Sequence, residues 1–197
     1  LMGLAASKPL SAEEKYKIVS AWQNKIFVTR DGTDWRIKDS KIFPATIYTP
    51  CPDAPNVAFY DDSLDEYVAY VRLRTYPDTP EKYREYFSKS DFNGNRQVLA
   101  SVARMTSKDL RHFSEPQVVL QPDERDPMID GVHTMSFHSP TVMKYPQAQD
   151  AYIMYSHALF QWHDWIIADD LSYYYTNNGT EPPGCNSMDI RIAGSRD

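Results

Sequence analysis

Two segments of the chain repeat one pattern without a gap: residues 138–155 match residues 53–70 at an offset of 85. Each copy has a short apolar run, a polar turn and a second alternating or apolar run, which predicts a β-hairpin. Such a unit cannot bury its hydrophobic face alone, so the units must stack or surround an axis. The matched positions are Pro55 and Pro140, Val57 and Val142, Tyr60 and Tyr145, Asp65 and Asp150, Tyr67 and Tyr152, and Tyr70 and Tyr155.

A second recurring feature is a turn of the form Ser/Thr-x-Asp. It occurs at Asp31, Asp109 and Asp197, after the strand-like segments 25–28, 98–105 and 189–193. Aspartate and serine or threonine close such turns by bonding to their own backbone. The unit is therefore a hairpin, an insertion, a third strand, the Asp turn and a fourth strand such as residues 116–120. Four strands per unit predict an all-β fold, a β-propeller; the alternative is a sandwich in which two hairpins match by chance.

The predicted organisation is a single partial propeller domain over residues 1–197, with blade portions at approximately 14–50, 51–122 and 133–197. This amounts to about two complete blades and part of a third. A strand at residues 16–19, turning at Gln23-Asn24, is preferred over a helix capped by Ser11. A short helical insertion is expected at residues 79–87, since Pro80 and Glu81 suit a first helical turn. Residues 159–170 are ambiguous, and residues 176–187 are predicted to be a loop.

Some repeated or turn residues are expected to serve the scaffold. Tyr70 and Tyr155 recur and are predicted to be core residues. Asp61 and Asp62 are predicted to be caps of the hairpin turn.

Composition excludes several classes of function. Lys and Arg total 21 against 27 Asp and Glu, a net charge of −6 without a basic cluster, which disfavours nucleic acid. No apolar run is long enough to cross a bilayer. Cys51 and Cys185 allow at most one disulfide and no zinc site, and the histidine spacings do not match a helix-face metal site, so we expect no metal.

The segments 14–17, 29–35, 53–72 and 103–109 together resemble the five-bladed β-propeller proteins related to glycoside hydrolase families 43 and 32. The resemblance covers roughly residues 14–197. It implies a carbohydrate-active protein that is secreted or periplasmic, of which this chain is a fragment with further blades on both sides. A calcium ion in the propeller channel is allowed by family analogy alone; no other cofactor is expected.

The resemblance also points to three candidate catalytic residues. Asp53-Ala-Pro55 resembles the family 43 strand start that supplies a carboxylate. At the place of the family's general acid the chain has His138, which can bind a sugar hydroxyl or act as an acid near neutral pH. Asp126 lies in an Arg-Asp-Pro triplet that in family 32 supports the transition state. The alternatives are a turn-forming Asp53 and a solvated loop at Asp126.

The aromatic segment after the second hairpin supplies candidate substrate-binding residues. Trp162, Asp164 and Trp165 are predicted to lie on one loop. Indole rings offer flat apolar partners to the CH faces of sugars, and carboxylates bind hydroxyl groups. The alternative is that these rings pack between blades.

The sequence therefore predicts a glycoside hydrolase-like protein that acts on or binds a saccharide in the propeller channel. Hydrolysis needs two carboxylates across the scissile bond, and His138 stands where one is expected, so enzymatic activity stays open. The rivals are a non-catalytic carbohydrate-binding propeller and a protein-interaction propeller.

Overall fold

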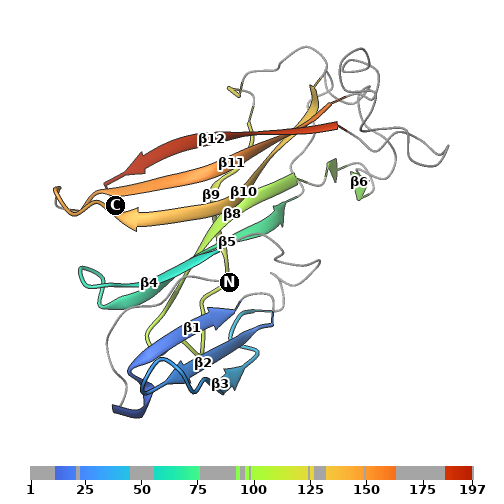
Figure 1. Ribbon diagram of the computed structural model, residues 1–197. Helices are drawn as coiled ribbons and strands as arrows, with labels where there is room; N and C mark the ends of the chain where they lie inside the picture. The colour runs from blue at the N-terminus through green and yellow to red at the C-terminus, as the bar shows by residue number, and fades with distance from the viewer. Residues whose placement is uncertain are drawn as a thin grey trace.

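The structure is a computed structural model, and it describes residues 12–20, 23–44, 56–75, 92–93, 96–97, 99–123, 125–126, 132–148, 150–162 and 185–196. These residues form antiparallel sheets, preceded by one short 3-10 turn, η1 (Ala12–Glu14). Three sheets of three or four strands follow one another along the chain, as Figure 1 shows. The predicted helix at residues 79–87 lies outside the described residues.

The first sheet has the order β1 (Tyr16–Ser20), β2 (Lys25–Thr29), β3 (Arg36–Ser40). The strand predicted at residues 16–19 is confirmed as β1, in place of the alternative helix. Asn24 takes a left-handed backbone with φ of 52° in the turn, a conformation that Asn tolerates better than most residues. Its side-chain oxygen accepts a hydrogen bond from Phe43 N at 2.9 Å, which ties the chain after β3 back to this turn.

The second sheet has the order β4 (Val57–Asp61), β5 (Glu66–Thr75), β8 (Leu99–Ser107), β9 (Gln117–Leu120). This is the predicted unit of hairpin, insertion, third strand, Asp turn and fourth strand. The insertion contains a two-stranded ribbon of β6 (Phe92–Asn93) and β7 (Arg96–Gln97). Each strand pairs with the next strand of the sheet in antiparallel register.

The third sheet has the order β10 (Val132–Lys144), β11 (Tyr152–Trp162), β12 (Cys185–Ser195). The second hairpin is confirmed, but its strands are longer than the sequence predicted. Trp162 ends β11, paired with Cys185, and does not lie on a loop; the predicted loop at residues 176–187 likewise gives way to strand from Cys185. Aromatic residues suit a strand as well as a loop, and pairing with β12 decides the matter here.

The second sheet is packed on both faces. On one face Tyr67, Ala69 and Val71 of β5 join a hydrophobic core with residues of the first sheet. On the other face Val68 and Tyr70 join a second core with residues of the third sheet. Side chains alternate between the faces of a strand, so β5 needs an unbroken apolar run to serve both cores. Figure 1 shows the second sheet between the first and the third.

The repeated tyrosines end in different surroundings. Tyr70 is 8% exposed, as predicted, but Tyr155 is 41% exposed, so the prediction of a core residue is wrong there. The third sheet covers the face of the second sheet that carries Tyr70. Among the described residues, no sheet covers the face that carries Tyr155.

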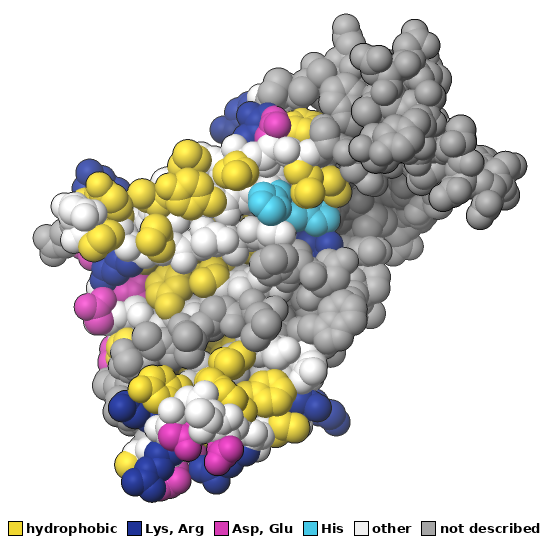
Figure 2. All heavy atoms as spheres, in the orientation of Figure 1, with side chains coloured by type: hydrophobic (Ala, Val, Ile, Leu, Met, Phe, Trp, Pro, Cys, Tyr) yellow, Lys and Arg dark blue, Asp and Glu magenta, His cyan; other side chains and the backbone are white. Residues whose placement is uncertain are grey.

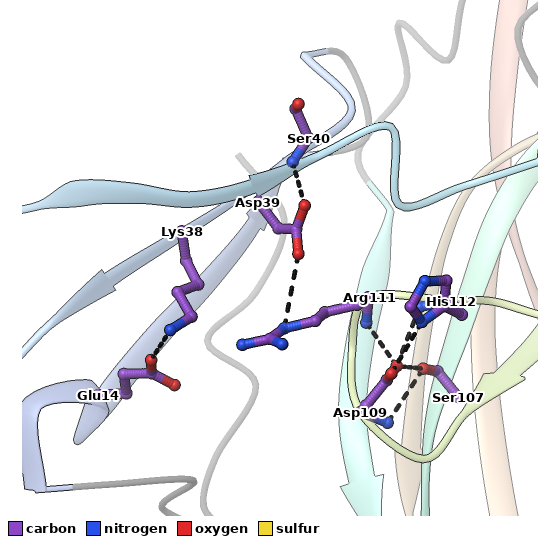
Figure 3. Close-up of polar contacts among 8 residues, drawn as sticks. All are labelled: Glu14, Lys38, Asp39, Ser40, Ser107, Asp109, Arg111 and His112. Carbon is purple, nitrogen blue, oxygen red and sulfur yellow. Dashed lines mark hydrogen bonds and ion pairs between the residues drawn. The ribbon is translucent and has the colours of Figure 1, made fainter.

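Two Asp turns are confirmed as hydrogen-bonded scaffold. Asp109 Oδ1 accepts hydrogen bonds from Arg111 N at 2.8 Å, His112 N at 2.9 Å and Ser107 Oγ at 3.1 Å. Asp31 Oδ1 makes the equivalent bonds with Thr33 N, Asp34 N and Thr29 Oγ1. Figure 3 shows the Asp109 turn beside Arg111, whose guanidinium also contacts Asp39 of β3 at 3.5 Å. The turn that links β8 to β9 therefore also forms an ion pair with the first sheet.

The two turns differ at the residue after the aspartate, where both have a positive φ. Gly32 fills this place in the first turn with φ of 90°, and Leu110 fills it in the second with φ of 61°. A leucine in this conformation is strained by about 1 kcal/mol or more. Leu110 is fully buried in the first core, and that burial offsets the strain.

We predict that Asp109→Ala lowers the free energy of unfolding at pH 7 by about 1 kcal/mol, which is about 2–4 °C in Tm. Burial acts to raise the pKa of Asp109, but hydrogen bonds from His112, Arg111 and Ser107 outweigh it and hold the pKa well below its ordinary value. The contribution is therefore present above about pH 4 and disappears as the pH falls further. Denaturant unfolding at pH 7 and at pH 2.5 or so measures it.

The matched control is Asp34→Ala, which removes the same charge from the other turn without removing the capping carboxylate. This variant should keep its Tm within about 1 °C of the wild-type value. Equal losses in both variants would show that charge, and not the turn hydrogen bonds, causes the effect.

Candidate functional site

A cavity of about 760 Å³ opens between the second and third sheets. Its polar lining includes Asp61, Tyr70, Arg104 and Tyr152, and its apolar lining includes Val142. Two groups of polar contacts join the second and third sheets, one at each end of β4. Asp61 ends β4 and marks one end; Asn56 precedes β4 and marks the other.

At the first end, the buried carboxylate of Asp61 links the two sheets. Its Oδ2 accepts a hydrogen bond from Tyr152 Oη of β11 at 2.5 Å, and its Oδ1 accepts from Ser63 Oγ at 2.7 Å and Ser63 N at 3.0 Å. Lys144 Nζ, at the end of β10, donates to Asp62 at 2.8 Å and approaches Asp61 at 3.5 Å. Asp61 and Asp62 thus lie at the predicted turn, and both also bind the third sheet, which the sequence did not predict.

The electrostatics of this cluster favour charged Asp61. Burial acts to raise the pKa of Asp61, but hydrogen bonds from Tyr152 and Ser63 and the charge of Lys144 outweigh it, so the pKa lies below its ordinary value. Burial and the bond to Asp61 raise the pKa of Tyr152. Asp61 therefore stays ionised and Tyr152 stays protonated, which are the states in which the hydrogen bond forms. The cluster joins the second sheet to the third.

At the other end of β4, Arg72 of β5 meets His138 of β10. Arg72 Nη1 lies 3.1 Å from His138 Nδ1, and the Arg72 backbone N donates to Asn56 Oδ1 at 2.8 Å. The buried Ser156 Oγ donates to the backbone oxygen of His138 at 2.8 Å. A β-bulge follows directly, with Ser139 at φ of 52°. Bulges re-aim side chains and are frequent beside functional sites.

The contact with Arg72 fixes the tautomer of His138. A guanidinium has donors and no acceptor, so Nδ1 of the imidazole must accept, and the ring proton must be on Nε2. His138 is also the direct strand partner of His157 on β11. Figure 2 shows histidine side chains beside one another on this part of the surface, next to basic side chains. This end of the hairpin thus joins a guanidinium and an imidazole in one hydrogen-bonded contact.

Asp126 lies in a separate turn after β9. Its Oδ2 accepts from Asp123 N at 2.8 Å, and its backbone N donates to Asp123 O at 3.1 Å. Asp126 also lines a smaller cavity of about 220 Å³ together with Phe137, Ser156 and Arg191. Phe137 precedes His138 in β10, so this cavity adjoins the strand that carries the candidate histidine.

The other candidates are only partly described. Asp53, Asp164 and Trp165 lie outside the described residues, and for Trp162 the structure describes the backbone alone. The catalytic and substrate-binding roles of all these residues stay predictions. Sequence reasoning missed Arg72 and Tyr152. Tyr152 matches the buried Tyr67 in the repeat, which makes it look like a core residue, and nothing in the sequence marks Arg72 as the partner of His138.

The described residues hold no group of three or more His, Cys, Asp or Glu side chains suited to a metal ion. Within the same part of the chain, no helix has the length and apolar character required to span a bilayer.

Comparison with known proteins does not assign the chain to a family. No family model matches, and no curated protein matches. Among solved structures, the chain is similar to the α-L-arabinofuranosidase Arb93A from Fusarium graminearum, solved in complex with an iminosugar inhibitor. The sequences are 14% identical, the TM-score is 0.39, and the match covers 92% of this chain and 40% of that one. The chain thus spans less than half the length of the enzyme chain it matches.

We predict that Tyr152→Phe lowers the free energy of unfolding by about 1–2 kcal/mol at pH 7, because it removes a donor from a buried carboxylate. The loss should be largest above about pH 4, where Asp61 is charged in both states, and should shrink as the pH falls through the lowered pKa of Asp61. Denaturant unfolding of both proteins across this pH range measures the difference.

The control for that variant is Tyr145→Phe, one residue beyond β10, where the ring is exposed. It should change stability by less than about 0.5 kcal/mol. If the loss of stability in Tyr152→Phe stayed constant from pH 7 to pH 3 or so, the loss would not depend on the charge of Asp61, and the prediction would be wrong.

Proposed function

We propose that this protein is a carbohydrate-binding β-propeller protein that holds a saccharide at the end of the inner hairpins where Arg72 meets His138. The observation that carries the proposal is the 3.1 Å contact between Arg72 Nη1 and His138 Nδ1. Support for a propeller comes from the repeated unit and from the packing of the second sheet, which is covered on both faces by neighbouring sheets.

The chemistry of this contact suits sugar hydroxyl groups. A hydroxyl both donates and accepts, so a site that presents fixed donors can orient it. The contact with Arg72 orients the imidazole, and an imidazole and a guanidinium together carry several N–H groups of the kind that bind hydroxyl oxygens. Ser156 fixes the backbone of His138 at the bulge. Trp162 and Trp165 stay predicted as the apolar partners of the sugar ring.

The same contact favours binding over hydrolysis with His138 as the acid. A histidine that serves as a general acid must carry protons on both ring nitrogens, and Nδ1 cannot carry one while it accepts from Arg72. Hydrolysis by a two-carboxylate mechanism would need Asp53 and a second acid. Glycoside hydrolase activity is therefore the second candidate, and it depends on Asp53.

The test of binding is His138→Asn. The asparagine oxygen can replace Nδ1 as the acceptor for Arg72, but the variant lacks the Nε2–H donor. We expect affinity for the saccharide found by glycan-array screening to fall about 5- to 10-fold, as for one lost hydrogen bond, with Tm unchanged within about 2 °C. Isothermal titration calorimetry measures the affinity.

The control is His112→Asn, which changes an exposed histidine in the turn after β8 and should leave affinity unchanged. Wild-type affinity in His138→Asn would contradict the placement of the saccharide at His138. If the wild-type protein bound no glycan, the proposal would be wrong and a protein-interaction propeller would be favoured.

Hydrolysis is tested separately by Asp53→Asn. If the bound saccharide is cleaved, this variant should lose turnover while Tm stays within a few degrees, because the change is isosteric. Release of reducing sugar measures turnover. Unchanged activity would remove Asp53 from the mechanism without affecting the binding proposal.

A further inference from the structure

The cavity of about 760 Å³ between the second and third sheets has an arginine, Arg104 of β8, in its wall. Arg104 is the direct strand partner of Tyr70 on β5 and of Gln117 on β9. The three side chains therefore form one row on the face that the third sheet covers. All three line the cavity, and much of its apolar lining comes from Leu120, Val142 and Met154.

The repeat shows that this arginine stands at the place of an apolar residue. Five residues before the aspartate of each Asp turn, the three units have Ile26, Arg104 and Ile192. Ile26 is 2% exposed and belongs to the first core, between the first and second sheets. Two units therefore have an isoleucine where the second unit has a guanidinium.

The wall that the third sheet supplies departs from the repeat as well. Four residues before the aspartate of the turn, the second unit has Met105 and the third unit has Ala193. Met105 is buried in the first core, whereas Ala193 lines the cavity. Protein interiors are close-packed, so a methyl group in place of a long side chain leaves space. The cavity thus lies between a small residue on one sheet and an arginine on the other.

The two carboxylates that line the cavity, Asp61 and Asp150, form no ion pair with Arg104. Asp61 accepts hydrogen bonds from Tyr152 and Ser63, and Asp150 is exposed in the turn between β10 and β11. Among the described residues, none of the ion pairs includes Arg104. The cavity therefore contains a half-buried guanidinium that no described carboxylate neutralises.

The hydrogen-bond partner of Arg104 is an uncharged phenol. Arg104 donates to the hydroxyl of Tyr70, which is 8% exposed. Burial raises the pKa of Tyr70, and the charge and the hydrogen bond of Arg104 act in the opposite direction without cancelling that effect. Tyr70 thus stays protonated at neutral pH, and a phenol hydroxyl can donate as well as accept.

We propose that this cavity binds a small carboxylic acid with an apolar body, whose carboxylate is held by Arg104. A guanidinium carries its N–H donors in a planar fork that matches the two oxygens of a carboxylate. The apolar body would contact Val142 and Met154. A cavity of this volume, mostly apolar with a few polar groups, is typical of small-molecule sites. The saccharide proposal concerns the other end of β4, so either proposal can fail alone.

The test uses phenylacetate as the probe and phenylacetamide as its uncharged counterpart of nearly the same shape. Both are titrated into the 197-residue chain, and binding is followed by NMR at the methyl group of Met154. Phenylacetate should bind at least about 10-fold more tightly than phenylacetamide, because hydrogen bonds between charged groups are the stronger ones.

Two variants remove the site in different ways. Arg104→Ile introduces the residue of the other two units and removes the guanidinium. Ala193→Met introduces the residue of the second unit and fills space in the cavity without a change of charge. Each should weaken phenylacetate binding at least about 10-fold and keep Tm within about 4 °C of the wild-type value. The control is Arg30→Gln, an exposed arginine of the first Asp turn, which should bind phenylacetate as the wild type does.

Three results would overturn the proposal. The first is a wild-type protein that does not bind phenylacetate. The second is equal affinity for phenylacetate and phenylacetamide, since the guanidinium would then have no part in binding. The third is wild-type affinity for phenylacetate in Arg104→Ile. Should that variant fail to fold, wild-type affinity in Ala193→Met would overturn the proposal in its place, because the ligand would then lie outside the cavity.

Discussion

The burial of β5 on both faces is the constraint on which the rest of the structure depends. A strand between two cores cannot place polar side chains on either side, so residues 67–71 form an unbroken apolar run. Because both faces are used, the first and third sheets must lie on opposite sides of the second sheet. At about 25 cal/mol for each Å² of apolar surface removed from water, such burial outweighs any single polar contact between the sheets.

The polar contacts lie at the ends of the strands, where the cores leave room for them. The Asp61–Tyr152 bond closes one end of the interface between the second and third sheets, and the Arg72–His138 contact closes the other. These two contacts differ in the role that we give them. Asp61 accepts hydrogen bonds from Ser63 and Tyr152 and serves the scaffold. The Arg72–His138 contact instead joins two side chains that carry N–H groups, beside a β-bulge, and we propose the ligand at that end.

Much of the fold could be predicted from local pattern. The hairpins, the Asp turns at Asp31 and Asp109 and the strand at the start of the first sheet follow from alternation and turn chemistry, both of which act over a few residues. The errors have long-range causes. Whether residues near Trp162 are loop or strand depends on pairing with β12, more than 20 residues along the chain. Whether Tyr155 is core depends on a covering sheet, which its own strand does not encode.

The sequence by itself determined the repeated unit, its order of strands and the turn that closes it, because these depend on side chains that contact their own or the next strand. It also singled out His138 as a departure from a family pattern. Only the tertiary structure decided that Arg72 reaches His138, that Asp61 binds Tyr152 and that Tyr155 is exposed on the third sheet. Each of these joins residues from different sheets, and their distances are set by how the sheets pack, which no local pattern records.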